Sequence, residues 1–120
     1  MIPAAILLFS LAAAIGLALV VMGVRYHRSS LTLGLVHASA AVLALTFLGT
    51  YILREPINML YNNAAVLFVL ALSGGVILLA LHDKHKPPPM IVVGIHAVMA
   101  LAGLLLLVFG AVTGTASTTG

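Results

Sequence analysis

The stretch from Ile2 to Val24 reads IPAAILLFSLAAAIGLALVVMGV and contains no charged side chain. An α-helix of about 20 apolar residues crosses a hydrocarbon layer about 30 Å thick, so this stretch predicts a membrane-spanning helix. No basic residue precedes it and Arg25 follows it, which is the reverse of the charge order in a secretory signal peptide. We therefore expect the first helix to be retained.

Three more apolar segments follow it along the chain: 31–53, 64–81 and 90–113. The connections hold every charged side chain, and they are residues 25–30, 54–63 and 82–89. Such short connections make consecutive helices antiparallel. The predicted fold class is all-α: an integral membrane four-helix bundle with up-down-up-down order, formed as a single transmembrane domain by residues 1–120.

The composition is that of a chain whose solvent is lipid. Hydrophobic residues make up 63% of it, charged residues 6%, and the mean hydropathy is +1.30, which lies outside the range of soluble domains. Because there is no cysteine, disulfides and thiolate metal sites are excluded. The two acids, Glu55 and Asp83, lie in connections, so the spans contain no carboxylate relay of the kind that many proton-coupled transporters use.

Positive charge is distributed unevenly among the connections. The first contains Arg25 and Arg28 and the third contains Lys84 and Lys86, whereas the second has one cation beside one acid. The positive-inside rule then places the first and third connections in the cytoplasm and both termini outside, and we expect a bacterial inner membrane. This topology also accounts for the net charge of +3 without nucleic-acid binding.

An internal repeat relates the two halves of the chain. Residues 36–45 and 95–104 share a pattern of β-branched residue, His, Ala, two variable positions, Ala, two variable positions, small residue and Leu, at an offset of 59. Because two helices separate equivalent positions, the halves 1–57 and 58–120 are expected to have the same orientation.

The match extends upstream of the histidines at an offset of 58. There the basic turn 25–28 corresponds to 83–86, and Gly16 corresponds to Gly74. The one-residue difference falls in a turn, where changes of length are well tolerated. Each half is therefore predicted to be a helix, a basic turn and a second helix with one histidine.

His37 and His96 are equivalent residues of the two halves. Each lies about six residues, or roughly 9 Å, inside its predicted helix, so both imidazoles are expected at one depth. Small residues share the helix faces of these histidines. They are Gly34, Ala41 and Ala44 near His37, and Ala100 and Gly103 near His96.

Two imidazoles at one depth on parallel, diagonal helices suit the two axial positions of a haem iron. The small residues would make room for the macrocycle. Its anionic propionates would reach the four cations of the basic connections, which are Arg25, Arg28, Lys84 and Lys86.

With these two histidines the chain resembles, in general design, the membrane-embedded b-type cytochromes of the four-helix kind. The resemblance implies one haem b per chain, held by His37 and His96, and electron transfer with a quinone or a protein partner. Because a bis-His iron has no open position, we expect an electron carrier rather than a turnover enzyme. The chain would act alone, as a homodimer, or as an accessory subunit of a respiratory or photosynthetic complex.

Two other interpretations stay open. The membrane histidines could instead donate hydrogen bonds between helices, to a backbone carbonyl or to a hydroxyl such as Ser39, Thr46 or Ser73. The chain would then be a cofactor-free structural or assembly subunit of a larger membrane complex. A metal or small-solute carrier is the third interpretation, with ligands at the cytoplasmic face from His27, His82 and His85.

Overall fold

The computed structural model describes residues 1–82, 86 and 88–119 of the chain. These residues form four α-helices: α1 (Ile2–Arg25), α2 (Leu31–Arg54), α3 (Met59–Ala80) and α4 (Met90–Thr119). Each helix is long and apolar enough to cross a membrane. The prediction of an all-α chain with four such helices is confirmed.

α1 and α2 begin at the first residues of their predicted spans, whereas α3 begins before its span 64–81 and α4 continues past its span 90–113. α2 begins after Ser30, whose side chain accepts a hydrogen bond of 3.1 Å from the Leu33 N–H. α3 begins at Met59 rather than Ala64, because the Asn58 side chain accepts hydrogen bonds from two N–H groups of the first turn. A capping side chain thus makes helix out of residues that the sequence analysis assigned to a connection.

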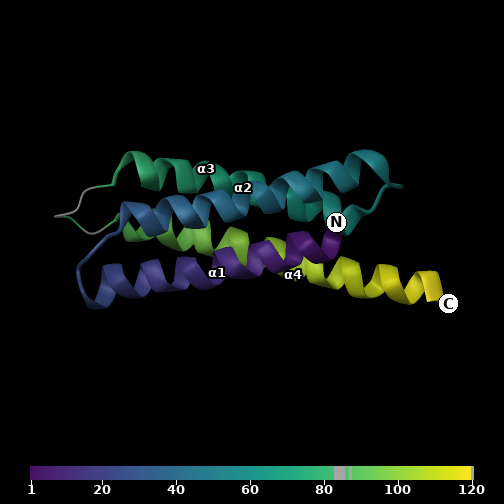
Figure 1. The fold of residues 1–120 in the computed structure, drawn as a ribbon, viewed down its shortest axis with the longest axis horizontal. Coiled ribbons are helices and arrows are strands. Elements are labelled where there is room, and N and C mark those ends of the chain that lie inside the picture. Colours follow the sequence, from purple (N-terminus) through teal and green to yellow (C-terminus); the bar gives the residue numbers. More distant parts are fainter. Residues whose placement is uncertain (83–85, 87, 120) are drawn as a thin grey trace.

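The four helices pack side by side as a bundle measuring 54 × 22 × 22 Å. α1 packs most extensively on α2 and α3 on α4, with smaller contacts between α2 and α3 and between α1 and α4. The pairs α1/α3 and α2/α4 are therefore diagonal to each other. Figure 1 shows the end of α1, the start of α2, the end of α3 and the start of α4 at one end of the bundle, and the N-terminus at the other.

The centre of the bundle is a stack of two phenylalanine rings from diagonal helices. Phe9 of α1 and Phe68 of α3 lie with their ring centroids 3.7 Å apart and their planes 7° from parallel. Both side chains are only 5% exposed. Ala44 and Leu48 of α2 and Leu107 of α4 are fully buried in the same cluster. Dispersion contacts in this dense interior hold the helices together, since burial among lipid tails supplies no hydrophobic driving force.

Six of the seven buried positions of α1 and α2 recur 59 residues later, the exception being Gly23, whose counterpart His82 is half-buried. The pairs of buried residues are Ile2 and Tyr61, Ala5 and Ala64, Phe9 and Phe68, Ala12 and Ala71, Ala44 and Gly103, and Leu48 and Leu107. The same interval separates the two histidines in the sequence. At these six pairs of positions, burial is therefore the same at an interval of 59 residues.

Gly110 provides a test of how tightly this interior is packed. A Cβ atom at Gly110 would lie 2.7 Å from Cε1 of Tyr61, a buried ring with little freedom to move, whereas a Cβ at Gly49 would meet nothing within 4 Å. We predict that Gly110→Ala lowers the free energy of unfolding by about 1–3 kcal/mol, as overpacking does, in SDS-driven unfolding from mixed micelles. Gly49→Ala should leave it unchanged or raise it, because alanine favours helix. Equal stability of the two variants would contradict the packing described for Tyr61.

Candidate histidine site

The structure brings together the side chains of His37 on α2 and His96 on α4. Their ring centroids lie 6.0 Å apart, and the ring planes meet at 71°, an edge-to-face arrangement. Because α2 and α4 are diagonal helices, this contact crosses the bundle axis. Two residues separated by 59 positions in the sequence therefore share one place in the interior.

Each imidazole also bonds to the neighbouring helix of its own half. The Nδ1 atom of His37 lies 2.6 Å from the carbonyl oxygen of Ala12, and that of His96 lies 2.6 Å from the carbonyl oxygen of Ala71. A carbonyl can only accept, so both Nδ1 atoms must carry a hydrogen and donate it. For a neutral imidazole this leaves Nε2 with its lone pair, and within the described residues neither Nε2 has a hydrogen-bond partner.

Two of the three hydroxyl groups considered as partners, those of Ser73 and Thr46, make other bonds. Ser73 donates to the carbonyl of Val69, and Thr46 donates to the carbonyl of Val42, each four residues earlier in its own helix. Of the acceptors weighed in the sequence analysis, the structure shows the backbone carbonyl.

Two glycines lie directly against the imidazoles. A Cβ at Gly16 would be 3.0 Å from Cε1 of His37, and a Cβ at Gly75 would be 3.2 Å from Cε1 of His96. By these contacts Gly16 corresponds to Gly75, at an offset of 59, and the match of Gly16 with Gly74 at an offset of 58 was wrong. Consecutive glycines make the two alignments indistinguishable by residue type, so only the ring contacts separate them.

The small residues near the histidines lie in different surroundings from one another. Ala44 and Gly103 are buried one level further along the bundle, where a Cβ at Gly103 would be 3.1 Å from the Phe68 ring. Gly34 faces a Leu79 methyl group, which a Cβ would approach to 3.4 Å. The remaining two predicted residues, both half-buried, are Ala41 and Ala100.

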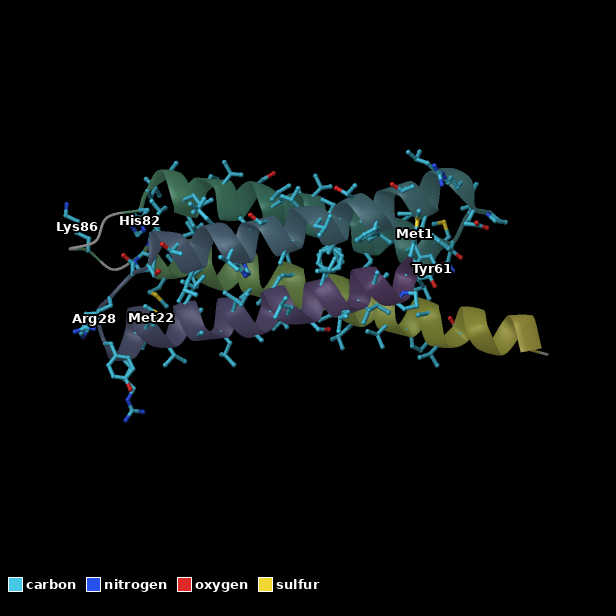
Figure 2. All side chains as sticks on the ribbon, in the orientation of Figure 1. Met1, Met22, Arg28, Tyr61, His82 and Lys86 are labelled. Atoms are coloured by element: carbon cyan, nitrogen blue, oxygen red, sulfur yellow. The ribbon has the colours of Figure 1, made fainter. Side chains whose placement is uncertain are left out.

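The cations of the basic connections lie beyond the imidazoles. Arg25, Arg28 and Lys86 are exposed, and Figure 2 shows Arg28 and Lys86 at the end of the bundle opposite Met1 and Tyr61. Lys84 lies outside the described residues. The placement of Arg28 and Lys86 agrees with a basic end on the histidine side of the bundle.

The predicted surface metal site consists of His27, His82 and His85; among the residues that the structure covers, no three His, Asp, Glu or Cys side chains come together. His85 lies outside that part of the chain. His27 follows α1 in the left-handed conformation, with φ of 51°, and this turn lets the Arg28 N–H donate to the carbonyl of Met22. His27 thus has a role in ending α1.

The sequence analysis named a backbone carbonyl as one acceptor for the membrane histidines, but it did not identify Ala12 and Ala71 as the residues that provide it, nor Gly75 as a residue against the His96 ring. The signal was present in both halves as an Ala followed four residues later by a Gly, at Ala12 and Gly16 and at Ala71 and Gly75.

Comparison of the chain with protein-family models, with curated proteins and with solved structures finds no match. The geometry of the site is therefore the basis for any functional argument.

The conformation of His27 leads to a prediction. A left-handed backbone costs a residue with a Cβ about 1 kcal/mol or more, and glycine avoids this cost. We expect His27→Gly to raise the free energy of unfolding by about 1 kcal/mol in SDS-driven unfolding. Tyr26→Gly is the matched control, because Tyr26 has a φ of −108° and should gain nothing. A loss of stability in His27→Gly would show that its side chain is needed where it lies.

Proposed function

We propose that this chain is a membrane electron-transfer protein that holds one haem b between α2 and α4, with His37 and His96 as the two axial ligands. The observation that carries the proposal is the imidazole pair. Its ring centroids are 6.0 Å apart, and two imidazoles bonded to one metal at about 2.0–2.1 Å would have centroids on the order of 6 Å apart. The spacing therefore fits two nitrogens on one iron.

The hydrogen bonds of the pair support the same assignment. A histidine that ligates a metal generally donates its other ring N–H to a carbonyl or carboxylate, which fixes the tautomer and raises the basicity of the ligating nitrogen. His37 and His96 both do so, through Nδ1 to Ala12 and Ala71. The remaining Nε2 atoms are the nitrogens that an axial ligand needs.

The other diagonal of the bundle is suited to a flat group at this level. A flat group held by His37 and His96 would have α1 and α3 as its other neighbours. At the level of the rings these helices present Gly16 and Gly75, which have no side chain. The propionates would be neutralised by exposed cations of the basic end, Arg25, Arg28 and Lys86, and by Lys84.

Haem b held by His37 and His96 would supply reversible one-electron transfer. The chain's own contribution is to hold the imidazoles and exclude water. Its electron partner would be a quinone or another protein, and the chain would serve alone, as a homodimer, or within a larger respiratory or photosynthetic complex.

We also propose the membrane arrangement. The chain forms an up-down-up-down bundle of two tandem hairpins, residues 1–57 and 58–120, in a bacterial inner membrane with the first and third connections in the cytoplasm. The recurrence of burial at an interval of 59 supports the repeat. The two His–carbonyl bonds support it independently, since each joins residues 25 positions apart.

A cofactor-free structural subunit is the second candidate, because one observation favours it. Two shallow grooves run along the exposed face of α2, and they share Leu35, Ser39 and Leu43. Small and apolar groups of this kind favour close approach of another membrane helix. The two candidates differ in whether the protein carries haem.

The haem assignment predicts the spectrum of the purified protein. In detergent, after expression in haem-replete cells, dithionite-reduced protein should show the sharp α and Soret bands of low-spin haem b, with about one haem per chain by pyridine haemochrome assay. His37→Ala and His96→Ala should each lose these bands. His27→Ala, which changes a histidine outside the helices, should keep them. A colourless wild-type protein, or unchanged haem content in both variants, would leave the structural subunit as the better assignment.

The orientation can be tested because the chain has no native cysteine. Tyr26 in the first connection is 60% exposed and Ile57 in the second is 85% exposed, so single cysteines introduced there are accessible to a membrane-impermeant maleimide. We expect Ile57→Cys to be labelled in intact spheroplasts and Tyr26→Cys to be labelled only after permeabilisation. The opposite pattern would reverse the proposed orientation.

A further inference from the structure

We propose that Gly16 and Gly75 are positioning residues. Each forms, with the alanine four residues before it, a backbone seat that holds one imidazole by its Nδ1–H and directs Nε2 away from the seat. The seats are properties of the chain itself. Their consequence for a bound haem rests on the function proposed above.

The geometry of an α-helix explains why glycine is needed at these positions. Residues four apart lie on the same face, and the Cα–Cβ bond tilts toward the helix N-terminus, so a side chain at position 16 would lean over the carbonyl of residue 12. That carbonyl is the acceptor of the His37 Nδ1–H at 2.6 Å. A side chain at position 16 would therefore stand where the ring must lie.

The distances agree with this explanation in both halves. A Cβ at Gly16 would be 3.0 Å from Cε1 and 3.4 Å from Nδ1 of His37. A Cβ at Gly75 would be 3.2 Å from Cε1 and 3.8 Å from Nδ1 of His96. The contacted atoms belong to a rigid ring that is tied at Nδ1, so the ring cannot yield without lengthening its hydrogen bond.

The alanines complete each seat. Ala12 and Ala71 are both 4% exposed, and each provides its carbonyl oxygen, which has a lone pair to spare beside the helix hydrogen bond. The tautomer of each imidazole is thus set by the backbone of the neighbouring helix.

Loss of a seat has a defined consequence for a metal ligand. Without the carbonyl acceptor, the imidazole can place its hydrogen on Nε2, and Nε2 then has no lone pair for iron. If Nε2 still ligates, it is less basic, because the Nδ1–H bond no longer raises its electron density. A less basic ligand favours the ferrous state, so the haem midpoint potential should rise.

The test uses the full chain, labelled with 15N-histidine and purified haem-free in detergent. In wild-type protein both histidines should give the 15N pattern of a hydrogen-bonded Nδ1–H and an unprotonated Nε2. Gly16→Ala should change the His37 resonances most, and Gly75→Ala those of His96. Each variant's other histidine then serves as its internal control for folding.

Gly74→Ala is the matched control, since its Cβ would make only ordinary van der Waals contacts with His96, at 3.5 Å from Cβ and 3.6 Å from Nδ1, whereas a Cβ at Gly75 would press on Cε1 at 3.2 Å. The expected order of effect is Gly16→Ala, then Gly75→Ala, then Gly74→Ala. With haem bound, the first two should raise the midpoint potential and alter the low-spin ferric EPR signal, which reports the angle between the imidazole planes.

Wild-type resonances in both seat variants would overturn the proposal, and so would equal disturbance of both histidines in each. A protein that binds no haem but shows the expected 15N changes would refute the proposed function and leave the seats established.

Discussion

At two levels of this bundle the interior accommodates one pair of rings from diagonal helices, and the rest of the structure depends on that limit. α1 and α3 supply the stacked pair Phe9 and Phe68, whereas α2 and α4 supply His37 and His96. At these two levels, where one diagonal provides rings, the other provides small residues beside them. Ala44 and Gly103 occupy that role in the phenylalanine cluster, and Gly16 and Gly75 do so beside the histidines. Large and small residues alternate between the diagonals because a bundle 22 Å wide has no room for four large side chains at once.

A polar ring in an apolar interior needs a hydrogen-bond partner, and here that partner is a backbone carbonyl of the neighbouring helix. Water is absent from a hydrocarbon layer, so an unsatisfied N–H costs several kcal/mol. A helix carbonyl can accept a second hydrogen bond without losing its first, provided that no side chain covers it. The Ala-to-Gly spacing uncovers one carbonyl in α1 and one in α3. The Nδ1–H bond to the carbonyl lowers the free-energy cost of placing each histidine in the membrane. It also leaves Nε2 as the nitrogen with a free lone pair.

The described charges lie at the ends of the bundle, and the rings lie between them. Arg28 and Lys86 gather at one end (Figure 2), and Tyr61 lies toward the other, where its ring meets Tyr51 edge to face. The histidine pair lies between the phenylalanine stack and the basic end. For the proposed haem, this order places the iron nearer the basic end than the opposite one, with cations on the side where anionic groups would emerge.

The sequence by itself determined the helices, their approximate lengths and the pairing of the histidines with each other. Uncharged runs long enough to cross a bilayer have one stable conformation there, the α-helix. The repeat in the sequence predicted that His37 and His96 lie at the same depth. Only the tertiary structure decided the true register of Gly16 with Gly75, the stack of Phe9 on Phe68 and the carbonyl acceptors. The start of α3 at Met59 was not predicted from the sequence, because the Asn58 cap outweighed the polarity of Asn62 and Asn63. Helix formation depends on neighbours along the chain, whereas ring contacts join residues 25 or 59 positions apart, and among many alanines and glycines only packing selects which of them meet.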